Sequence, residues 1–315
     1  MAELAHDPNW PRAGGWPALR PDATGHETSV DLAILGVPAW RTSLSPTGAH
    51  ATPAAIREAL RRYSPALVGG AAALDLGAAL DLGAALAFAD AGDIDEPDGP
   101  DGEARTRAEV SRVLSAARVL VALGGDNSIT VPVALGAGPG ALDRAGLVTI
   151  DAHYDLRDGV SNGSPVRRLI EAGLDPARIV QIGIADFANS AEYARRARDL
   201  GITVVHRDDL HGRAPADVMA EALAIAGAAG GPVHLDIDVD ACDRSVAPGC
   251  PASLPGGLAA WELRALVRAA ARDPRVRTVD VAEVDATADA PDGRTVRLAA
   301  LCVLEVAAGL ALRSS

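Results

Sequence analysis

Short apolar runs recur along the 315-residue chain, and stretches with helical spacing separate them. The apolar runs have the length and composition of buried strands, which we predict at residues 31–36, 119–123, 147–150, 179–184, 202–205, 233–237 and 278–281. The stretches between them predict helices at residues 53–63, 105–117, 188–199, 214–229, 261–271 and 297–312. Alternating strands and helices indicate βαβ units, so the expected fold is α/β, a three-layer α/β/α sandwich around a central, mostly parallel sheet.

Three segments fall outside this alternation. Residues 1–28 are polar and rich in proline and glycine, so we expect a loose N-terminal arm and a single domain at residues 29–315. Residues 90–101 are acidic and rich in glycine and proline, which predicts a solvated loop. The sequence LDLGAA at residues 74–79 recurs at 80–85, and one short tandem copy indicates a surface segment, not a repeat protein.

Charge and composition narrow the class of partner and the compartment. The net charge is -13 and all 29 basic residues are arginine, which argues against nucleic acid or an anionic membrane as partner and favours a small molecule. No signal peptide and no membrane-spanning apolar run is recognisable. Cys242, Cys250 and Cys302 form neither a zinc-binding pattern nor a disulfide framework, so we expect a reduced, cytoplasmic location.

Acidic residues follow two of the predicted strands. Residues 151–155 read Asp-Ala-His-Tyr-Asp, and residues 236–240 read Asp-Ile-Asp-Val-Asp. Alternate residues of an extended segment share a face, so each segment presents a row of oxygen ligands, and the first adds an imidazole. Carboxylates crowded at buried strand ends need cations, because unpaired charges there cost many kcal/mol. Both segments therefore predict a metal centre.

Two further segments are expected at the same edge of the sheet. Residues 124–128, GGDNS, follow the predicted strand at 119–123 and so emerge at its carboxyl end, where open α/β sheets bind ligands. Residues 243–257 are rich in turn-forming residues that can wrap backbone around a site. His234 precedes the second acidic segment on its strand, and we expect a core histidine with satisfied ring nitrogens.

These motifs resemble those of the ureohydrolase superfamily, the manganese hydrolases that include arginase, agmatinase and formimidoylglutamase. The resemblance rests on GGDNS, DAHYD at 151–155, DIDVDACD at 236–243, APG at 247–249 and the late Glu283, and it extends over nearly the whole chain from residue 36. It implies a three-layer α/β/α fold, a binuclear Mn²⁺ centre and hydrolysis of a C–N bond in a guanidino or formimino group. It also implies a homo-oligomer, a trimer or hexamer.

By position, the resemblance assigns metal-binding roles to five residues. Asp151 and Asp238 would bridge the two ions, Asp155 would complete one site, and His153 and Asp240 would complete the other. Four carboxylates offset the charge of two divalent ions, and oxygen ligands with one imidazole suit Mn²⁺. Asp236 replaces the small residue usual in the family and is a candidate partner behind the ligands.

Asn127 is the main departure from the family pattern, because it stands where a histidine ligand is usual. An amide oxygen can ligate a hard cation, but it is a weaker donor to Mn²⁺ than imidazole. We therefore expect a second ion that is weakly held or bound through the Asn127 oxygen. A structural asparagine in the turn after Gly-Gly is an equally good interpretation. Asn127 also motivates a third possibility, a degenerate, non-catalytic relative.

The segment after the first acidic motif bears on the substrate. Agmatinase-like members carry His-Gly-Thr-Pro there, whereas residues 161–165 read Ser-Asn-Gly-Ser-Pro, which is more like formimidoylglutamase. Arg157 continues the first motif as Asp-Leu-Arg, another formimidoylglutamase-like feature, and a guanidinium suits the carboxylates of N-formimino-glutamate. Arg157, Ser161 and Asn162 are therefore candidates for substrate binding, with an ordinary surface arginine as the alternative for Arg157.

The expected reaction is hydrolysis of N-formimino-L-glutamate to L-glutamate and formamide, a step of histidine degradation. In the family chemistry, hydroxide produced at the metal ions attacks the formimino carbon, and Asp155 acts as general acid and base. Glu283 would orient the cationic amidine and act with Asp155 in catalysis, with a simple ion-pair role as its alternative. The runner-up is a guanidino-compound hydrolase of the agmatinase or guanidinobutyrase type that releases urea.

Overall fold

The computed structural model describes residues 7–20, 29–69, 79–138 and 141–313. Its centre is an eight-stranded sheet in the order β4-β1-β5-β10-β9-β6-β7-β8, and every neighbouring pair of strands is parallel. The strands are β1 (Val30–Val37), β4 (Phe88–Asp93), β5 (Ala117–Gly124), β6 (Gly146–Ile150), β7 (Ile179–Ile184), β8 (Thr203–His206), β9 (Val233–Asp238) and β10 (Val276–Ala282). A separate antiparallel pair is formed by β2 (Ala66–Leu67) and β3 (Leu80–Asp81).

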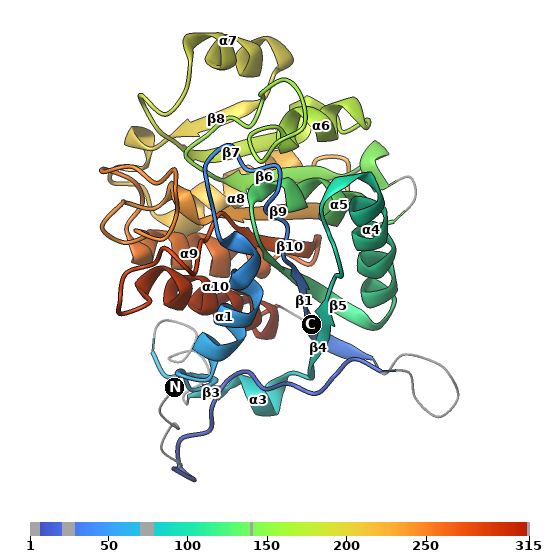
Figure 1. Ribbon diagram of the computed structural model, residues 1–315, viewed down its shortest axis with the longest axis vertical. Helices are drawn as coiled ribbons and strands as arrows, with labels where there is room; N and C mark the ends of the chain where they lie inside the picture. Colours follow the sequence, from blue (N-terminus) through green and yellow to red (C-terminus); the bar gives the residue numbers. More distant parts are fainter. Residues whose placement is uncertain (1–6, 21–28, 70–78, 139–140, 314–315) are drawn as a thin grey trace.

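Helices cover both faces of this sheet (Figure 1). One face carries α1 (Thr52–Leu60), α8 (Pro215–Ala226), α9 (Ala260–Ala271) and α10 (Arg294–Ala311). The other face carries α4 (Gly99–Ala116), α5 (Thr130–Leu135), α6 (Pro165–Glu171) and α7 (Ala191–Leu200). The short α3 (Leu82–Ala85) follows β3. The predicted three-layer α/β/α fold is confirmed, and every predicted strand is present within one or two residues of its expected bounds.

The loop predicted at residues 90–101 is confined to residues 94–98, and both of its ends are regular structure instead. Residues 88–93 form β4, an edge strand with too few apolar side chains to make an apolar run. Its acidic residues are neutralised, since the Arg57 guanidinium lies 2.7 Å from Asp90 and 2.6 Å from Asp93. Helix α4 then begins at Gly99, with a proline in its first turn and Asp101 near its positive end, both of which favour a helix start.

The described part of the N-terminal arm is docked, whereas we had expected a loose segment. The Trp16 ring stacks on Phe88 with 4.5 Å between centroids. Leu19 N–H donates to the Asp90 carbonyl, and Asp90 N–H donates to the Pro17 carbonyl, so the arm extends the pairing at the β4 edge. The first LDLGAA copy lies almost entirely outside the described residues, and the second forms β3 and α3.

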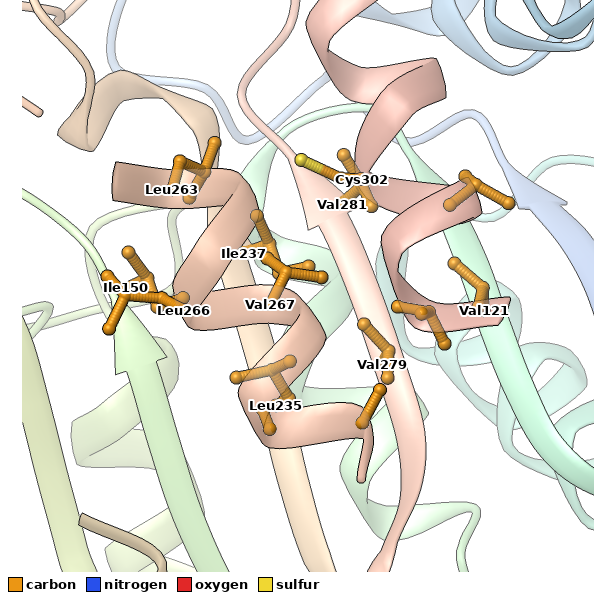
Figure 2. Packing of buried hydrophobic residues seen from close by; sticks show 14 of the residues in the cluster. Val121, Ile150, Leu235, Ile237, Leu263, Leu266, Val267, Val279, Val281 and Cys302 are labelled. Atoms are coloured by element: carbon orange, nitrogen blue, oxygen red, sulfur yellow. The ribbon is translucent and has the colours of Figure 1, made fainter. Parts of the chain in front are cut away.

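The core on the α9 face brings together side chains from the centre of the sheet (Figure 2). Leu263, Leu266 and Val267 of α9 pack over Leu235 and Ile237 of β9. Helix α9 covers β9, and β9 leads into the second acidic segment at residues 236–240. The packing of α9 therefore helps to determine the position of that segment. None of the helices in the described ranges combines the length and apolar character needed to cross a bilayer.

We expect Leu266→Ala to lower the free energy of unfolding by about 2 to 5 kcal/mol, because it leaves a cavity over the central strands. Leu266 is 1% exposed, whereas Trp261 on the same helix is 62% exposed. Trp261→Ala is therefore the matched control, expected to stay within about 0.5 kcal/mol of the parent. Chemical denaturation measures both, and equal effects would contradict this account of the core.

Candidate metal centre

Four central strands deliver the candidate residues to one edge of the sheet. β6 ends at Ile150 and is followed by Asp151, whereas β9 ends at Asp238 and is followed by the 3-10 turn Val239–Ala241. β5 is followed by the 3-10 turn Asn127–Ile129, and β10 by Glu283. These strands are neighbours in the order β5-β10-β9-β6 and parallel, so their carboxyl ends meet at the edge where α/β sheets bind ligands.

Asp151, His153 and Asp240 form a group suited to a metal ion. Each offers a ligand atom, and these atoms lie within 4.8 Å of one another. His153 Nδ1 lies 3.1 Å from Asp240 Oδ2 and 3.4 Å from Asp151 Oδ1. Asp151 Oδ2 and Asp240 Oδ1 are buried and accept no hydrogen bond within the described part of the chain. Two carboxylates with spare oxygens and one imidazole fit a hard or borderline divalent cation such as Mn²⁺.

A cavity of about 290 Å³ lies against this group. It is lined by His153, Asp155, Asp238, Asp240 and Glu283, among others, so the structure gathers all of these predicted residues around one space. Asp155 and Glu283 both have left-handed backbone conformations, with φ of 52° and 62°. Such conformations cost roughly 1–3 kcal/mol in a residue with a side chain and cluster at functional sites.

Asn127 connects two of the acidic residues. Its side-chain Nδ2 donates to Asp155 Oδ2 over 2.7 Å, and its backbone N–H donates to Glu283 Oε1 over 2.7 Å. Its amide oxygen accepts a hydrogen bond from Thr130 Oγ1. The amide nitrogen therefore faces Asp155, an arrangement that matches the structural interpretation of Asn127; ligation through its oxygen stays a prediction.

The candidate substrate-binding residues Arg157, Ser161 and Asn162 differ in whether they line the cavity. Arg157 and Asn162 line the cavity, and Asn162 Nδ2 donates to Glu283 Oε1 over 2.7 Å. Ser161 is 7% exposed and is not among the described residues that line the cavity. Its backbone groups bond Ser164 Oγ, which closes the turn between them. Ser161 thus supports the loop that carries Asn162.

Crowding of buried carboxylates dominates the electrostatics. Burial is the largest cause that raises the pKa of Asp151 to about 6 and those of Asp155 and Asp238 well above their usual range, with neighbouring carboxylates adding to it. Burial, followed by the charges of Asp126 and Asp240, raises the pKa of Glu283 to about 8. This site therefore favours bound positive charge.

His153 and Asp240 shift each other in opposite directions. Burial works against the protonated imidazole, but the charges of Asp240 and Asp151 and their hydrogen bonds outweigh it and raise the pKa of His153 to about 12. Burial also works against the Asp240 carboxylate, yet the charge of His153 outweighs it and lowers the pKa of Asp240. The proton on His153 therefore supplies positive charge within the group of residues that would bind a cation.

Asn189 is a site residue that sequence reasoning missed. Its Nδ2 donates to the carbonyls of Ala152 and Ala185, and its Oδ1 accepts from Tyr154 N–H. It therefore ties the loop after β7 to the first acidic segment, and it lines the cavity. The sequence offered only a weak signal, because Asn189 precedes the helix-capping Ser190 and reads as part of that cap.

Comparison with known proteins supports the same fold. The arginase family matches residues 30–309. Formimidoylglutamase from Halalkalibacterium halodurans is 33% identical over 290 residues, which cover 89% of this chain and 88% of that protein. The crystal structure of formimidoylglutamase from Bacillus subtilis gives a TM-score of 0.85 at 29% identity, covering 99% of this chain and 95% of that one.

A metal-bound structure is also similar. The formiminoglutamase of Trypanosoma cruzi, solved with Mn²⁺, gives a TM-score of 0.78 at 26% identity and covers 90% of this chain and 94% of that chain. Enzymes of the arginase family are binuclear and Mn²⁺-dependent. The group formed by Asp151, His153 and Asp240 is a candidate for one such site.

Metal and protons are expected to compete at this site. Asp151 and Glu283 have raised pKa values of about 6 and about 8, so the metal-free folded state binds more protons than the unfolded state at intermediate pH. The stability of this metal-free state therefore falls as pH rises from about 4 to 8, and His153, whose pKa is raised to about 12, extends the fall above pH 6.5. Mn²⁺ must displace these protons, so its stabilising effect should grow with pH.

Thermal melts from pH 5 to 8, with a chelator or with excess Mn²⁺, measure this effect as the Mn²⁺-dependent increase in Tm. We expect the increase to widen with pH and to shrink in Asp240→Asn, which removes a ligand charge at nearly constant volume. An increase that is the same at every pH would contradict the competition.

Proposed function

The chain belongs to the arginase family, and from that premise we propose that it hydrolyses N-formimino-L-glutamate to L-glutamate and formamide. It is a hydrolase acting on C–N bonds of linear amidines. The observation that carries the substrate is a cavity of about 290 Å³ whose lining includes Arg157 as well as His153 and Asp240 of the metal-binding group. This arrangement suits a substrate with an amidine at one end and carboxylates at the other.

Arg157 is placed to bind a carboxylate. It is the one arginine among the described residues that line the cavity, and its guanidinium makes no hydrogen bond or ion pair to another described residue. Its chain lies against Gly163, where a Cβ atom would come within 2.7 Å of the Arg157 Cδ. An unpaired guanidinium at a cavity wall can bind a carboxylate in bidentate fashion.

We propose that the ligands gathered here bind two Mn²⁺ ions. Asp151, His153, Asp155, Asp238 and Asp240 would hold them. When bound, Mn²⁺ polarises the amidine and makes water nucleophilic at neutral pH. The site residues then need only orient the substrate and move its protons.

Asp155 and Glu283 supply those two roles. Asp155 accepts a hydrogen bond from Asn127 at Oδ2, which orients its carboxylate, and this carboxylate would take a proton from the attacking water. Asp155 would then pass that proton to the glutamate nitrogen as its bond to the formimino carbon breaks, releasing glutamate and formamide. Glu283 would bind the cationic amidine through charge-assisted hydrogen bonds, held in place by Asn127 and Asn162.

We propose a homo-oligomer, a trimer or hexamer as the resemblance implies, and a cytoplasmic location. Size-exclusion chromatography with light scattering measures the first directly.

The substrate assignment predicts stoichiometric glutamate and formamide from N-formimino-L-glutamate with the Mn²⁺-loaded protein. Arg157→Ala should raise KM by about 10- to 100-fold, because a charge-assisted hydrogen bond contributes roughly 1.5–3 kcal/mol. Arg157→Lys should recover part of that loss, since it keeps the charge but not the bidentate geometry.

The matched control is Arg195→Ala, an exposed arginine on α7 that pairs with Glu192 and is not among the described residues that line the cavity. Agmatine and guanidinobutyrate serve as competing substrates, assayed for urea. Urea release would move the assignment to a guanidino hydrolase, and no turnover with bound Mn²⁺ would support a non-catalytic relative.

Replacing Asn127 should change metal retention. Asn127→His adds an imidazole donor beside Asp155, so we expect Mn²⁺ bound per chain after dialysis to rise toward two. Elemental analysis of dialysed protein measures it, with Thr130→Val as the control because it removes only the partner of the Asn127 oxygen. Unchanged retention in Asn127→His would mean that position 127 does not reach the ions.

A further inference from the structure

Hydrogen bonds hold the backbone of Arg157 on both sides of its Cα atom. Arg157 N–H donates to the Gly163 carbonyl over 2.9 Å, and the Arg157 carbonyl accepts from Arg167 Nε over 2.7 Å. Arg167 N–H donates in turn to the Asp155 carbonyl, which belongs to the first acidic segment. The point at which the Arg157 side chain leaves its loop is therefore fixed relative to the candidate metal centre.

The Arg157 side chain lies across Gly163 and occupies space that a larger residue would fill. A Cβ atom at Gly163 would lie 2.7 Å from Arg157 Cδ and 3.2 Å from Arg157 Nε. Carbon atoms in van der Waals contact lie about 3.5–4.0 Å apart, so such a Cβ atom would displace Arg157 Cδ by about 1 Å. Gly163 is not among the described glycines with positive φ, so its backbone conformation does not require a glycine. The close approach of Arg157 does.

Leu44 packs over the same face of Gly163. It comes from the segment between β1 and α1, and its Cδ1 would lie 3.1 Å from a Cβ atom at Gly163. Leu44 N–H donates to Asn162 Oδ1 over 3.0 Å, and Asn162 N–H donates to the Thr42 carbonyl over 3.3 Å, so two hydrogen bonds hold this segment against the loop. Leu44, Gly163 and Arg157 all line the cavity. The stem of Arg157 is therefore confined at the cavity wall, whereas its guanidinium is left unpaired.

We propose that Gly163 is a specificity-determining residue, because the space left by its missing side chain holds the Arg157 guanidinium where it binds a carboxylate of the substrate. The inference rests on the proposed function and adds a residue that selects anionic amidines. An arginine whose stem is already confined loses less conformational entropy when its guanidinium binds a ligand. Gly163 acts through Arg157, so any residue with a side chain at position 163 weakens carboxylate binding by moving the guanidinium.

The test is the affinity of the Mn²⁺-loaded protein for L-glutamate, the product that carries the carboxylates, measured by isothermal titration calorimetry. We expect Gly163→Ala to weaken this affinity about 10-fold, because misplacing an interacting group by about 1 Å can cost up to 100-fold. In an Arg157→Ala background the same change should alter the affinity by less than about 2-fold, since the side chain that it displaces is absent. The KM for N-formimino-L-glutamate should rise in parallel while kcat changes little.

The Gly163→Ala variant is expected to fold, because the atoms that it displaces are the ends of the flexible side chains of Arg157 and Leu44. Its Tm should therefore stay close to that of the parent. If it does not fold, Leu44→Ala provides a second variant. Leu44→Ala removes the neighbouring contact and should cause a smaller loss of L-glutamate affinity that also disappears in the Arg157→Ala background.

Gly69→Ala is the matched control, because a Cβ atom at Gly69 would meet nothing within 4 Å and its φ is not positive. Its affinity for L-glutamate should equal that of the parent. Unchanged affinity in Gly163→Ala would overturn the inference, as would an equal loss with and without Arg157 or a parent that binds no L-glutamate. Failure of the proposed function is distinct, because it would show as L-glutamate binding without hydrolysis of N-formimino-L-glutamate.

Discussion

Mutual repulsion among buried carboxylates is the constraint on which the rest of this structure depends. Asp151, Asp155, Asp238, Asp240 and Glu283 meet where the central strands end, and each is almost fully buried. Charges placed there need a compensating cation or proton, because the interior screens them poorly. The scaffold holds them together through packing on both faces of the sheet, and the bound metal of the family supplies the compensation. Stability and activity are therefore coupled at one site.

The hydrogen bonds around the carboxylates separate their roles. Asn127 N–H and Asn162 Nδ2 both donate to Glu283 Oε1, and Asn127 Nδ2 donates to Asp155, so the single residue Asn127 links the proposed proton carrier to the proposed amidine binder. Left-handed backbone at Asp155 and Glu283 is maintained by this network and by the bond from Glu283 N–H to the Gly125 carbonyl. A residue that looks like a lost ligand in sequence is thus a connecting element in the structure.

Substrate choice is expected to depend on the loops over the strand ends. The loop that carries Arg157 and Asn162 forms one wall of the cavity, and Asn189 holds the loop after β7 against the first acidic segment. The strand ends carry the metal-binding residues, whereas Arg157, the proposed carboxylate-binding residue, lies on a loop. A sheet that supports the chemistry and loops that carry the selectivity are a division that α/β folds permit, because loops vary without disturbing the core.

The sequence by itself determined the strands, the parallel α/β architecture and the acidic segments at the strand ends, because apolar runs and the two-residue alternation are local properties of the chain. It misjudged residues 90–101, since an edge strand paired on one side needs few apolar residues and its charges are satisfied by the distant Arg57. Only the tertiary structure decided which way the Asn127 amide faces, that Asn189 ties two loops, and that Asp236 pairs with Asp280 on the neighbouring strand. Those features depend on strand order and register, which are set by packing between segments far apart in the chain.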